Sequence, residues 1–185
     1  MKDMILDELK DGMEKGIVSF EKSLSKVRTG RASISLLDGI KVDYYGVPTP
    51  LNQVATLSTP ESRLILISPW DKSVIGDIEK AIQKSDLGLM PGSDGNVIRI
   101  TIPHLTEESR KELVKVVKKM AEESRVRLRN DRRNANTQLK ILKKDGDISE
   151  DDLHGYQTEV QEITDEYIKK ADAVLAAKEK EIMEI

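Results

Sequence analysis

All six prolines of this 185-residue chain fall in one stretch, between Pro48 and Pro103. Proline lacks a backbone N–H donor and its ring clashes with the preceding helical turn, so it interrupts helices. The segments before and after this stretch are therefore free to form uninterrupted helices, whereas the stretch itself is not. This distribution predicts an α+β protein in which long helices flank a small inserted domain.

The two proline-free parts carry apolar residues in steps of three and four, which is the spacing of one helical face. The pattern predicts a helix over residues 1–29, a second that begins after Thr106 and a third that begins after Ser149. The stripe residues are Ile5, Leu9, Met13, Ile17, Phe20, Leu24 and Val27; Leu113, Val117, Met120, Ala121, Leu128, Ala135, Leu139 and Leu142; and Leu153, Tyr156, Val160, Ile163, Tyr167, Ala171, Val174 and Ile182. Three striped helices with few loops predict a three-helix bundle, because this packing buries all three stripes.

The proline-containing stretch has the composition of short strands. Runs that are β-branched or alternate in polarity, bounded by Gly, Pro, Asn and Asp, occur at residues 40–46, 53–59, 63–69 and 96–103. Such runs predict strands. A helical segment at about 72–85 separates the third run from the fourth. The stretch therefore predicts a small β/α/β domain.

This domain is predicted to span residues 31–104, and the bundle residues 1–30 and 105–185. Both ends of the insert must leave the bundle at nearly the same place, so the two connecting segments form a predicted hinge. Its residues are Arg28, Thr29, Gly30, Arg31, Ala32, Pro103, His104 and Leu105. The glycine gives one segment backbone freedom. A long bundle that carries a compact domain at its end predicts an L-shaped molecule whose two parts move relative to each other.

The second predicted helix is strongly basic over part of its length. Residues 124–144 hold eight basic side chains and one acid, Asp131, whereas residues 145–185 hold thirteen acids and four lysines. The net charge of −3 for the whole chain hides this separation. A cationic helix on an acidic protein favours a phosphate-rich partner bound at one place.

Four arginines of this helix fall within a sector of about 100° beside the apolar stripe. They are Arg125, Arg129, Arg132 and Arg133, and Arg127 lies outside the sector. A guanidinium group binds phosphate oxygens with two donors and stacks on bases, so these arginines predict an RNA-binding face. The alternative is a solvated face paired with the acidic third helix. That alternative stays open, although Asp131 is the one acid inside the segment that could pair locally.

The sequence contains no recognisable catalytic or metal-binding pattern. It has no cysteine and two histidines that are far apart, His104 and His154. Residues 145–156 imitate a calcium loop, but Glu150 occupies the position of the required glycine and Tyr156 that of the bidentate glutamate. We therefore expect no metal, no cofactor and no enzymatic activity.

Three aromatic residues of the predicted insert, Tyr44, Tyr45 and Trp70, are expected in its core. An enzyme with its site in this domain would need titratable groups at recognisable spacing, which the sequence lacks. No apolar run approaches the roughly 20 residues that span a bilayer. The first residues also lack the apolar stretch of a signal peptide. We expect a cytoplasmic protein without membrane contact.

Five long segments of the chain resemble the bacterial ribosome recycling factor family. They are VRTGRAS (27–33), LLDGIKVDYYGVPTPLNQVA (36–55), KAIQKSDLGL (80–89), SDGNVIRITIPHLTEESRKEL (93–113) and VRLRNDRRNAN (126–136). The likeness extends from end to end and includes KEKEIME at 178–184. These motifs are unlike those of other families.

The resemblance implies a three-helix bundle with an inserted β/α/β domain, in an L shape similar in outline to transfer RNA. It implies a non-catalytic translation factor that acts with elongation factor G and GTP. The implied activity separates post-termination ribosomes into subunits and releases messenger and deacylated transfer RNA. The implied partners are elongation factor G and the large ribosomal subunit with its ribosomal RNA, bound by a monomer without a cofactor.

The resemblance also implies functions for particular residues. Arg110, Arg129 and Arg132 match positions of the family that contact RNA, and Arg28 and Arg31 match positions beside the hinge. With the helical wheel, the predicted RNA-binding residues are Arg110, Arg125, Arg129, Arg132 and Arg133. A general RNA-binding or chaperone-like helical protein is the alternative. Comparable affinity for unrelated structured RNAs would identify that alternative.

Overall fold

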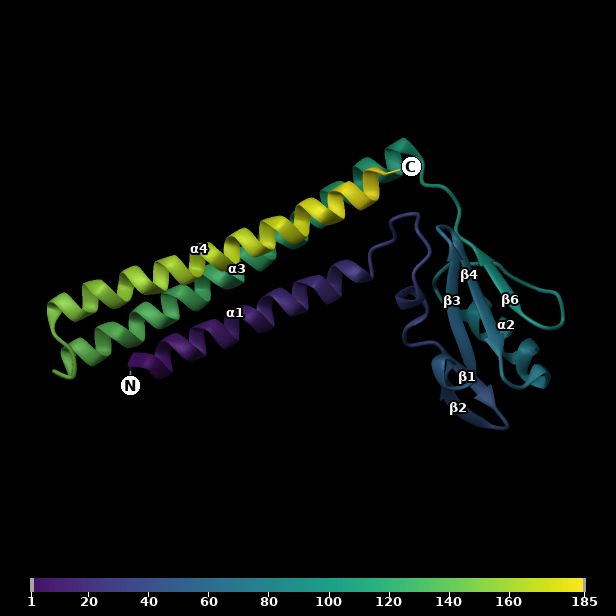
Figure 1. Ribbon diagram of the computed structural model, residues 1–185, viewed down its shortest axis with the longest axis horizontal. Coiled ribbons are helices and arrows are strands. Elements are labelled where there is room, and N and C mark those ends of the chain that lie inside the picture. Colours follow the sequence, from purple (N-terminus) through teal and green to yellow (C-terminus); the bar gives the residue numbers. More distant parts are fainter. Residues whose placement is uncertain (1, 185) are drawn as a thin grey trace. The chain divides into compact units, whose positions relative to one another are not determined.

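The computed structural model describes residues 2–184 and separates the chain into two compact units (Figure 1). One unit contains the residues up to Val27 and those from Glu108 onward, and the other contains Arg28–Glu107. The inserted unit thus extends three residues beyond the predicted insert at each end. All eight predicted hinge residues consequently belong to the inserted unit.

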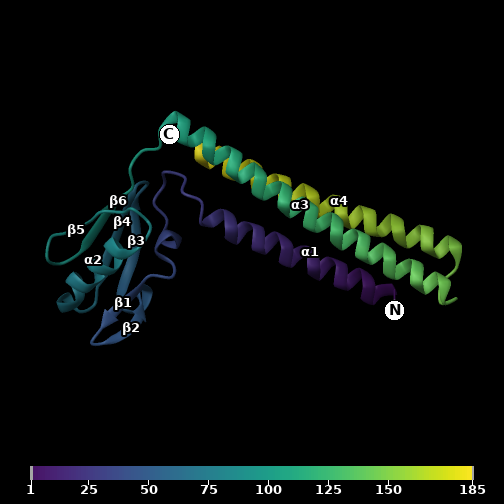
Figure 2. The same ribbon diagram turned by 180° about the vertical axis from the view of Figure 1, so that it is seen from behind.

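The first unit is a bundle of three long helices, α1 (Lys2–Ser25), α3 (Glu107–Lys144) and α4 (Glu150–Met183). Helices α3 and α4 lie side by side and antiparallel, with α1 along them (Figures 1 and 2). Helix α4 begins after Ser149, as predicted, and the structure shows a capping box there. The hydroxyl of Ser149 accepts from the backbone N–H of Asp152 at 3.1 Å, and the Asp152 carboxylate accepts from the backbone N–H of Ser149 at 3.0 Å. This exchange satisfies two donors that the helix end would otherwise leave without partners.

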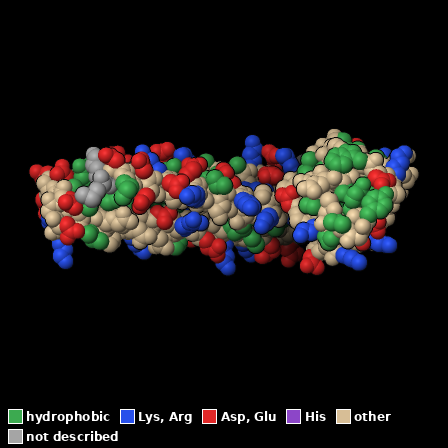
Figure 3. Space-filling model, turned by 90° about the horizontal axis from the view of Figure 1, so that it is seen from below, with side chains coloured by type: hydrophobic (Ala, Val, Ile, Leu, Met, Phe, Trp, Pro, Cys, Tyr) green, Lys and Arg blue, Asp and Glu red, His purple; other side chains and the backbone are tan. Residues whose placement is uncertain are grey.

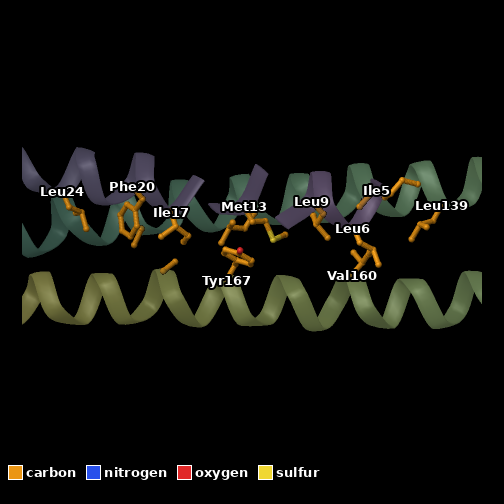
Figure 4. Close-up of a cluster of buried hydrophobic side chains, with 14 of the residues drawn as sticks. Ile5, Leu6, Leu9, Met13, Ile17, Phe20, Leu24, Leu139, Val160 and Tyr167 are labelled. Carbon is orange, nitrogen blue, oxygen red and sulfur yellow. The ribbon is translucent and has the colours of Figure 1, made fainter. Parts of the chain in front are cut away.

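The three predicted apolar stripes form the bundle core, and every stripe residue is buried or half-buried there. Met13, Leu128, Leu139 and Val160 have no exposed surface. Figure 4 shows Tyr167 of α4 pointing toward Met13 of α1, with the other stripe residues of α1 in a row along the same interface. The predicted bundle is therefore confirmed. Since each fully buried apolar side chain contributes about 1.5–3 kcal/mol, this row dominates the stability of the unit.

The inserted unit is built on a four-stranded antiparallel sheet. Its strand order is β3 (Ala55–Glu61), β4 (Leu64–Pro69), β6 (Ile98–Thr101), β5 (Pro91–Ser93). Helix α2 (Ile75–Lys84) packs its apolar face on the same core. The fully buried residues of this core are Val42, Ile65, Ile67, Ile78, Ile82, Ile98 and Ile100. Alternate residues of β4 and β6 point into it, as the period of a strand requires.

A two-stranded sheet completes the inserted unit, formed by β1 (Lys41–Tyr44) and β2 (Val47–Pro50). The two residues between them, Tyr45 and Gly46, both have positive φ, +50° and +83°. This is the hairpin turn whose twist matches that of the flanking strands. The backbone N–H of Gly46 donates to Asp43 Oδ1 at 2.7 Å and closes the turn.

Strands β2 and β5 were not predicted from the sequence. Both contain proline, which cannot donate to a strand ladder and is confined to edges. Both lie at an edge, β2 in the two-stranded sheet and β5 at the end of the four-stranded order. Three short 3₁₀ helices were also not predicted, at Ile34–Leu37, Leu51–Gln53 and Lys72–Val74. The last of these lies within the predicted 72–85 helix and leads directly into α2.

Two of the three aromatic residues expected in the core are exposed, so that prediction was wrong for them. Trp70 is 68% exposed and Tyr45 is 73% exposed. Each has a polar partner at the surface: Trp70 Nε1 donates to Thr56 Oγ1 at 3.0 Å, and the Tyr45 hydroxyl donates to Asp71 Oδ2 at 2.7 Å. Figure 3 shows hydrophobic side chains gathered on one face of the inserted unit. Tyr45, Val47 and Trp70 are all more than half exposed, and the bond from Tyr45 to Asp71 brings Tyr45 close to the residue that follows Trp70; we call these three residues the aromatic patch.

Candidate nucleic-acid interface

Helix α3 presents the four predicted arginines in different electrostatic settings. Arg125 makes the most hydrogen bonds to carboxylates. Its Nε and Nη2 donate to Asp172 Oδ1 of α4 at 2.9 and 2.7 Å, and its Nη1 donates to Glu122 Oε2 at 3.2 Å. The bonds to Asp172 and then Glu122 raise the pKa of Arg125, although burial opposes them. For Arg125, therefore, the alternative of pairing with the acidic third helix applies, and its positive charge is balanced within the bundle.

Arg129 makes fewer hydrogen bonds than Arg125, and its acid lies outside the basic segment 124–144. Its Nη2 donates to Glu122 Oε1 at 2.7 Å, so Glu122 binds both Arg129 and Arg125. Hydrogen bonds from Arg129 and then Arg125 lower the pKa of the Glu122 carboxyl. Glu122 lies two residues before the basic segment and was therefore missed. Because this pair is solvated, a phosphate group can displace the carboxylate at small cost.

Arg132 is held by a neutral group instead of a carboxylate. Its Nη1 donates to Gln161 Oε1 of α4 at 3.1 Å, while Gln161 Nε2 donates to Asp165 Oδ1 at 2.8 Å. Arg132 is half-buried, as its place nearest the apolar stripe predicts. An amide acceptor fixes the guanidinium group without cancelling its charge. Arg132 is therefore positioned by a partner that carries no charge.

The other two predicted RNA-binding residues also lie on α3. Arg133 is exposed and makes one long hydrogen bond, 3.4 Å from Nη1 to Asn130 Oδ1. Arg110 is half-buried near the start of the helix. At 1.5 Å per residue it lies about 33 Å along the helix from Arg132, so the two would contact different places on a partner. We call Arg129, Arg132 and Arg133 the arginine face.

The opposite flank of α3 faces α1 and carries Arg127 and Asp131. Two glycines of α1 make room for them: a Cβ on Gly16 would lie 3.6 Å from Arg127 Nε, and one on Gly12 would lie 3.8 Å from Asp131 Oδ2. Asp131 Oδ2 is buried without a hydrogen-bond partner among residues 2–184. Burial raises the pKa of the Asp131 carboxyl, and the nearby charge of Arg127 partly offsets that rise.

Replacing Asp131 with asparagine is expected to increase the stability of the bundle at neutral pH. Since folding raises the pKa of this carboxyl, the folded chain holds the proton more tightly than the unfolded chain. The contribution of the Asp131 side chain to stability is therefore greatest at acidic pH, where it is protonated, and is lost as the pH rises through the folded-state pKa. Urea unfolding across a pH series should show that the stability gained by Asp131→Asn disappears below about pH 3.9, the ordinary pKa of an aspartate side chain. A gain of equal size at every pH would contradict this account.

The first connecting segment is anchored to the inserted unit. An Nη2 hydrogen of Arg28 points at the backbone carbonyl of Leu87 and bonds to it. Thr29 is buried, and Gly30 adopts a positive φ of +76° with its Cβ position 3.3 Å from Leu105 Cγ. Arg28 thus has a partner inside the unit, and the left-handed backbone at position 30 explains the glycine.

The neighbouring residues of both segments extend the sheet unit. The backbone N–H of Ala32 donates to the Ser62 carbonyl at 2.7 Å, and that of Ile102 donates to the Arg63 carbonyl at 2.8 Å. The remaining predicted hinge residues differ in exposure. Arg31, Pro103 and His104 are exposed and Leu105 is half-buried.

Replacing Gly30 with alanine is expected to destabilise the inserted unit by about 1–2 kcal/mol, because an L-residue at this φ meets its own backbone. The added Cβ would also press on Leu105. The matched control is Gly76→Ala in α2, where the Cβ meets no atom within 4 Å. That change is expected to stabilise the unit by about 0.5–1 kcal/mol. Thermal unfolding of both variants checks the pair, and equal effects would refute the backbone argument.

Residues 2–184 contain no group of three side chains that could bind a metal ion. In the imitated calcium loop, Glu150 instead forms an ion pair with Lys143, which lowers the pKa of its carboxyl. Both histidines are exposed. None of the helices between residues 2 and 184 has a stretch long and apolar enough to cross a bilayer.

The fold and the site together define a class of protein: a three-helix bundle with a small sheet unit inserted after its first helix and an arginine face on its second. The model of the family "Ribosome recycling factor" matches residues 20–183. The ribosome-recycling factor of Syntrophus aciditrophicus is 70% identical, and that of Bacillus subtilis 57% identical, each over 185 residues and the full length of both chains. The chain therefore belongs to the ribosome recycling factor family.

Two solved structures agree with this fold. The solution structure of a ribosome recycling factor superposes with a TM-score of 0.80 at 42% identity, covering 100% of this chain and 98% of that one. A second is described as models for the T. thermophilus ribosome recycling factor and the E. coli elongation factor G bound to the E. coli post-termination complex. It gives a TM-score of 0.68 at 44% identity over 100% of both chains.

Proposed function

We propose that this protein separates post-termination ribosomes into subunits together with elongation factor G and GTP. Messenger and deacylated transfer RNA are released, and the subunits become available for a new round of initiation. The bundle binds ribosomal RNA of the large subunit, and the protein itself catalyses no reaction. This activity places the protein in the cytoplasm.

The observation that carries the proposal is the charge of Arg132, which is held in position by a neutral amide. RNA phosphate can bind this guanidinium without first displacing a carboxylate. Arg129 and Arg133 lie on the same side of α3, so a few phosphates of one RNA strand could contact all three. The acidic remainder of the chain limits binding elsewhere on RNA. Three phosphate contacts would give a log–log salt slope of roughly −2 to −3.

The aromatic patch supports a protein partner for the inserted unit. Exposed Trp and Tyr side chains are enriched among the residues that dominate protein–protein binding energy. Elongation factor G accompanies a recycling factor in the solved complex described above. We propose that the aromatic patch contributes to the contact with elongation factor G, while the arginine face binds RNA. The inserted unit would then move when GTP is hydrolysed, about the two points where the chain passes between the units, at Val27–Arg28 and Glu107–Glu108.

A light-scattering assay on post-termination ribosomes tests the proposal. Scattering is expected to fall as subunits separate when this protein, elongation factor G and GTP are all present. Omitting any one of them is expected to abolish the decrease. A general RNA-binding protein would instead show comparable affinity for unrelated structured RNAs in a filter-binding competition, and that result would remove the ribosome-specific function.

A further inference from the structure

One contact of the arginine face crosses from α3 to α4 through uncharged atoms. Gln161 lies on α4, exposed, and its Oε1 accepts from Arg132 Nη1 at 3.1 Å. The other side of the same amide is also occupied, because Nε2 donates to Asp165 Oδ1 at 2.8 Å, one helical turn further along α4. The three residues form a chain of hydrogen bonds that ends on a carboxylate.

The orientation of the Gln161 amide decides which of its atoms faces Arg132. An amide can turn by 180° and present either its oxygen or its nitrogen. Asp165 accepts hydrogen bonds and cannot donate them while ionised, so it favours the orientation in which Nε2 faces Asp165 and Oε1 faces Arg132. The carboxylate thus selects the amide orientation that accepts from a guanidinium group, while remaining one residue removed from the arginine charge.

The neighbouring arginines show what a carboxylate at the position of Gln161 would do. Arg125 has Asp172 at 2.7 Å and Glu122 at 3.2 Å, and Arg129 has Glu122 at 2.7 Å. In each case phosphate must compete with an acid that already neutralises the arginine. A glutamine is nearly the same size as a glutamate but leaves the full positive charge on its partner.

We infer that Gln161 is a positioning residue for RNA binding, oriented by Asp165, which fixes the Arg132 guanidinium group for a phosphate without neutralising it. The inference rests on the proposed function, because it assumes that Arg132 contacts RNA. It adds a determinant on α4, a helix whose net charge is negative and which would otherwise be assigned no part in binding RNA.

The decisive variant is Gln161→Glu, measured by equilibrium binding to large ribosomal subunits over a series of salt concentrations. Affinity is expected to fall about three- to tenfold, because the new carboxylate competes with phosphate for Arg132. The log–log salt slope is expected to shrink by about one, since one fewer cation is released from the RNA. A purely structural role for Gln161 would leave that slope unchanged.

Two further variants separate charge from position. Gln161→Met keeps the length of the side chain but removes the acceptor, so affinity is expected to fall by about twofold while the slope stays the same. Gln138→Glu makes the same chemical change on the flank of α3 that faces α1 and is expected to leave binding and slope near those of the wild type. Circular dichroism should show the bundle folded in all three.

The outcomes also distinguish this inference from the proposed function. If Gln161→Glu binds with the wild-type affinity and slope while Arg132→Ala binds weakly, the positioning role is wrong and the arginine face stands. If Gln161→Glu and Gln138→Glu weaken binding equally, the effect is one of overall charge and the positioning role is again wrong. If Arg132→Ala itself binds normally, RNA binding by this face is refuted.

Discussion

Arg132→Ala is expected to weaken binding to large ribosomal subunits by about ten- to a hundredfold, the range for a hydrogen bond to a charged group. Among the arginines of the face, Arg132 is the one that a neutral amide of α4 holds in position, and within residues 2–184 it forms no ion pair. Subunit separation in the light-scattering assay should fall in parallel, because the variant occupies fewer ribosomes. Fluorescence titration of labelled protein against large subunits gives the affinity directly.

Arg127→Ala is the matched control for that experiment. It removes the same group from the same helix, but on the flank that faces α1, and it is expected to change affinity by no more than about twofold. Arg125→Ala should behave differently again. Because Arg125 binds Asp172 and Glu122, its loss should lower stability more than affinity. Equal losses of affinity for all three variants would contradict the distinction between the two flanks.

Leu128→Ala is expected to lower the free energy of unfolding of the bundle by about 2–5 kcal/mol, the range for such a change in a tightly packed core. Leu128 has no exposed surface, and its Cδ2 lies 3.9 Å from the Cβ position of Gly16 on α1. The cavity would therefore open between α1 and α3, where the glycine offers no side chain to fill it. Urea unfolding followed by helical circular dichroism measures the loss.

Val126→Ala controls for the general effect of shortening an apolar side chain on the same helix. Val126 is 44% exposed, so its replacement is expected to change stability by no more than about 0.5 kcal/mol. A similar small change for Leu128→Ala would mean that the bundle core repacks freely, contrary to the close fit of the two helices.

The helices of the bundle could be predicted because their information is local and periodic. The apolar stripe of α1 identifies the face of that helix that is buried. Ser149 marks the start of α4 from local sequence alone, without any tertiary contact. The central strands β4 and β6 could also be predicted, because each is a β-branched run in the sequence. Strands β2 and β5 could not be predicted in this way, because their prolines suggest turns. These segments become strands only when a partner strand pairs with them.

The aromatic residues show a different limit. Trp70 and Tyr45 were expected in the core of the inserted domain, yet the indole N–H and the phenol hydroxyl each bind a polar surface group, Thr56 and Asp71. Which side chains surround an aromatic ring depends on loops whose paths the sequence does not reveal. Exposure of these two rings is therefore information that the structure adds.

The RNA-binding residues stay a prediction, but the structure shows what the sequence could not say about them. A helical wheel places Arg125, Arg129, Arg132 and Arg133 in one sector of α3 and cannot say which side chain of α4 lies opposite each. The rotation and sliding of α4 against α3 decide that Asp172 meets Arg125 and that Gln161 meets Arg132. This alignment follows from packing along the whole interface, so no local motif encodes it.

The connectivity of the bundle has a consequence for its synthesis. Helix α1 leaves the ribosome before α3 and α4, and these packing partners follow only after the roughly 80 residues of the inserted unit. At about 5–20 residues per second, translation of that stretch takes about 4–16 seconds. During this interval the apolar side of the nascent amino-terminal helix has nothing of its own chain to cover it, so chaperone capture is most favourable then.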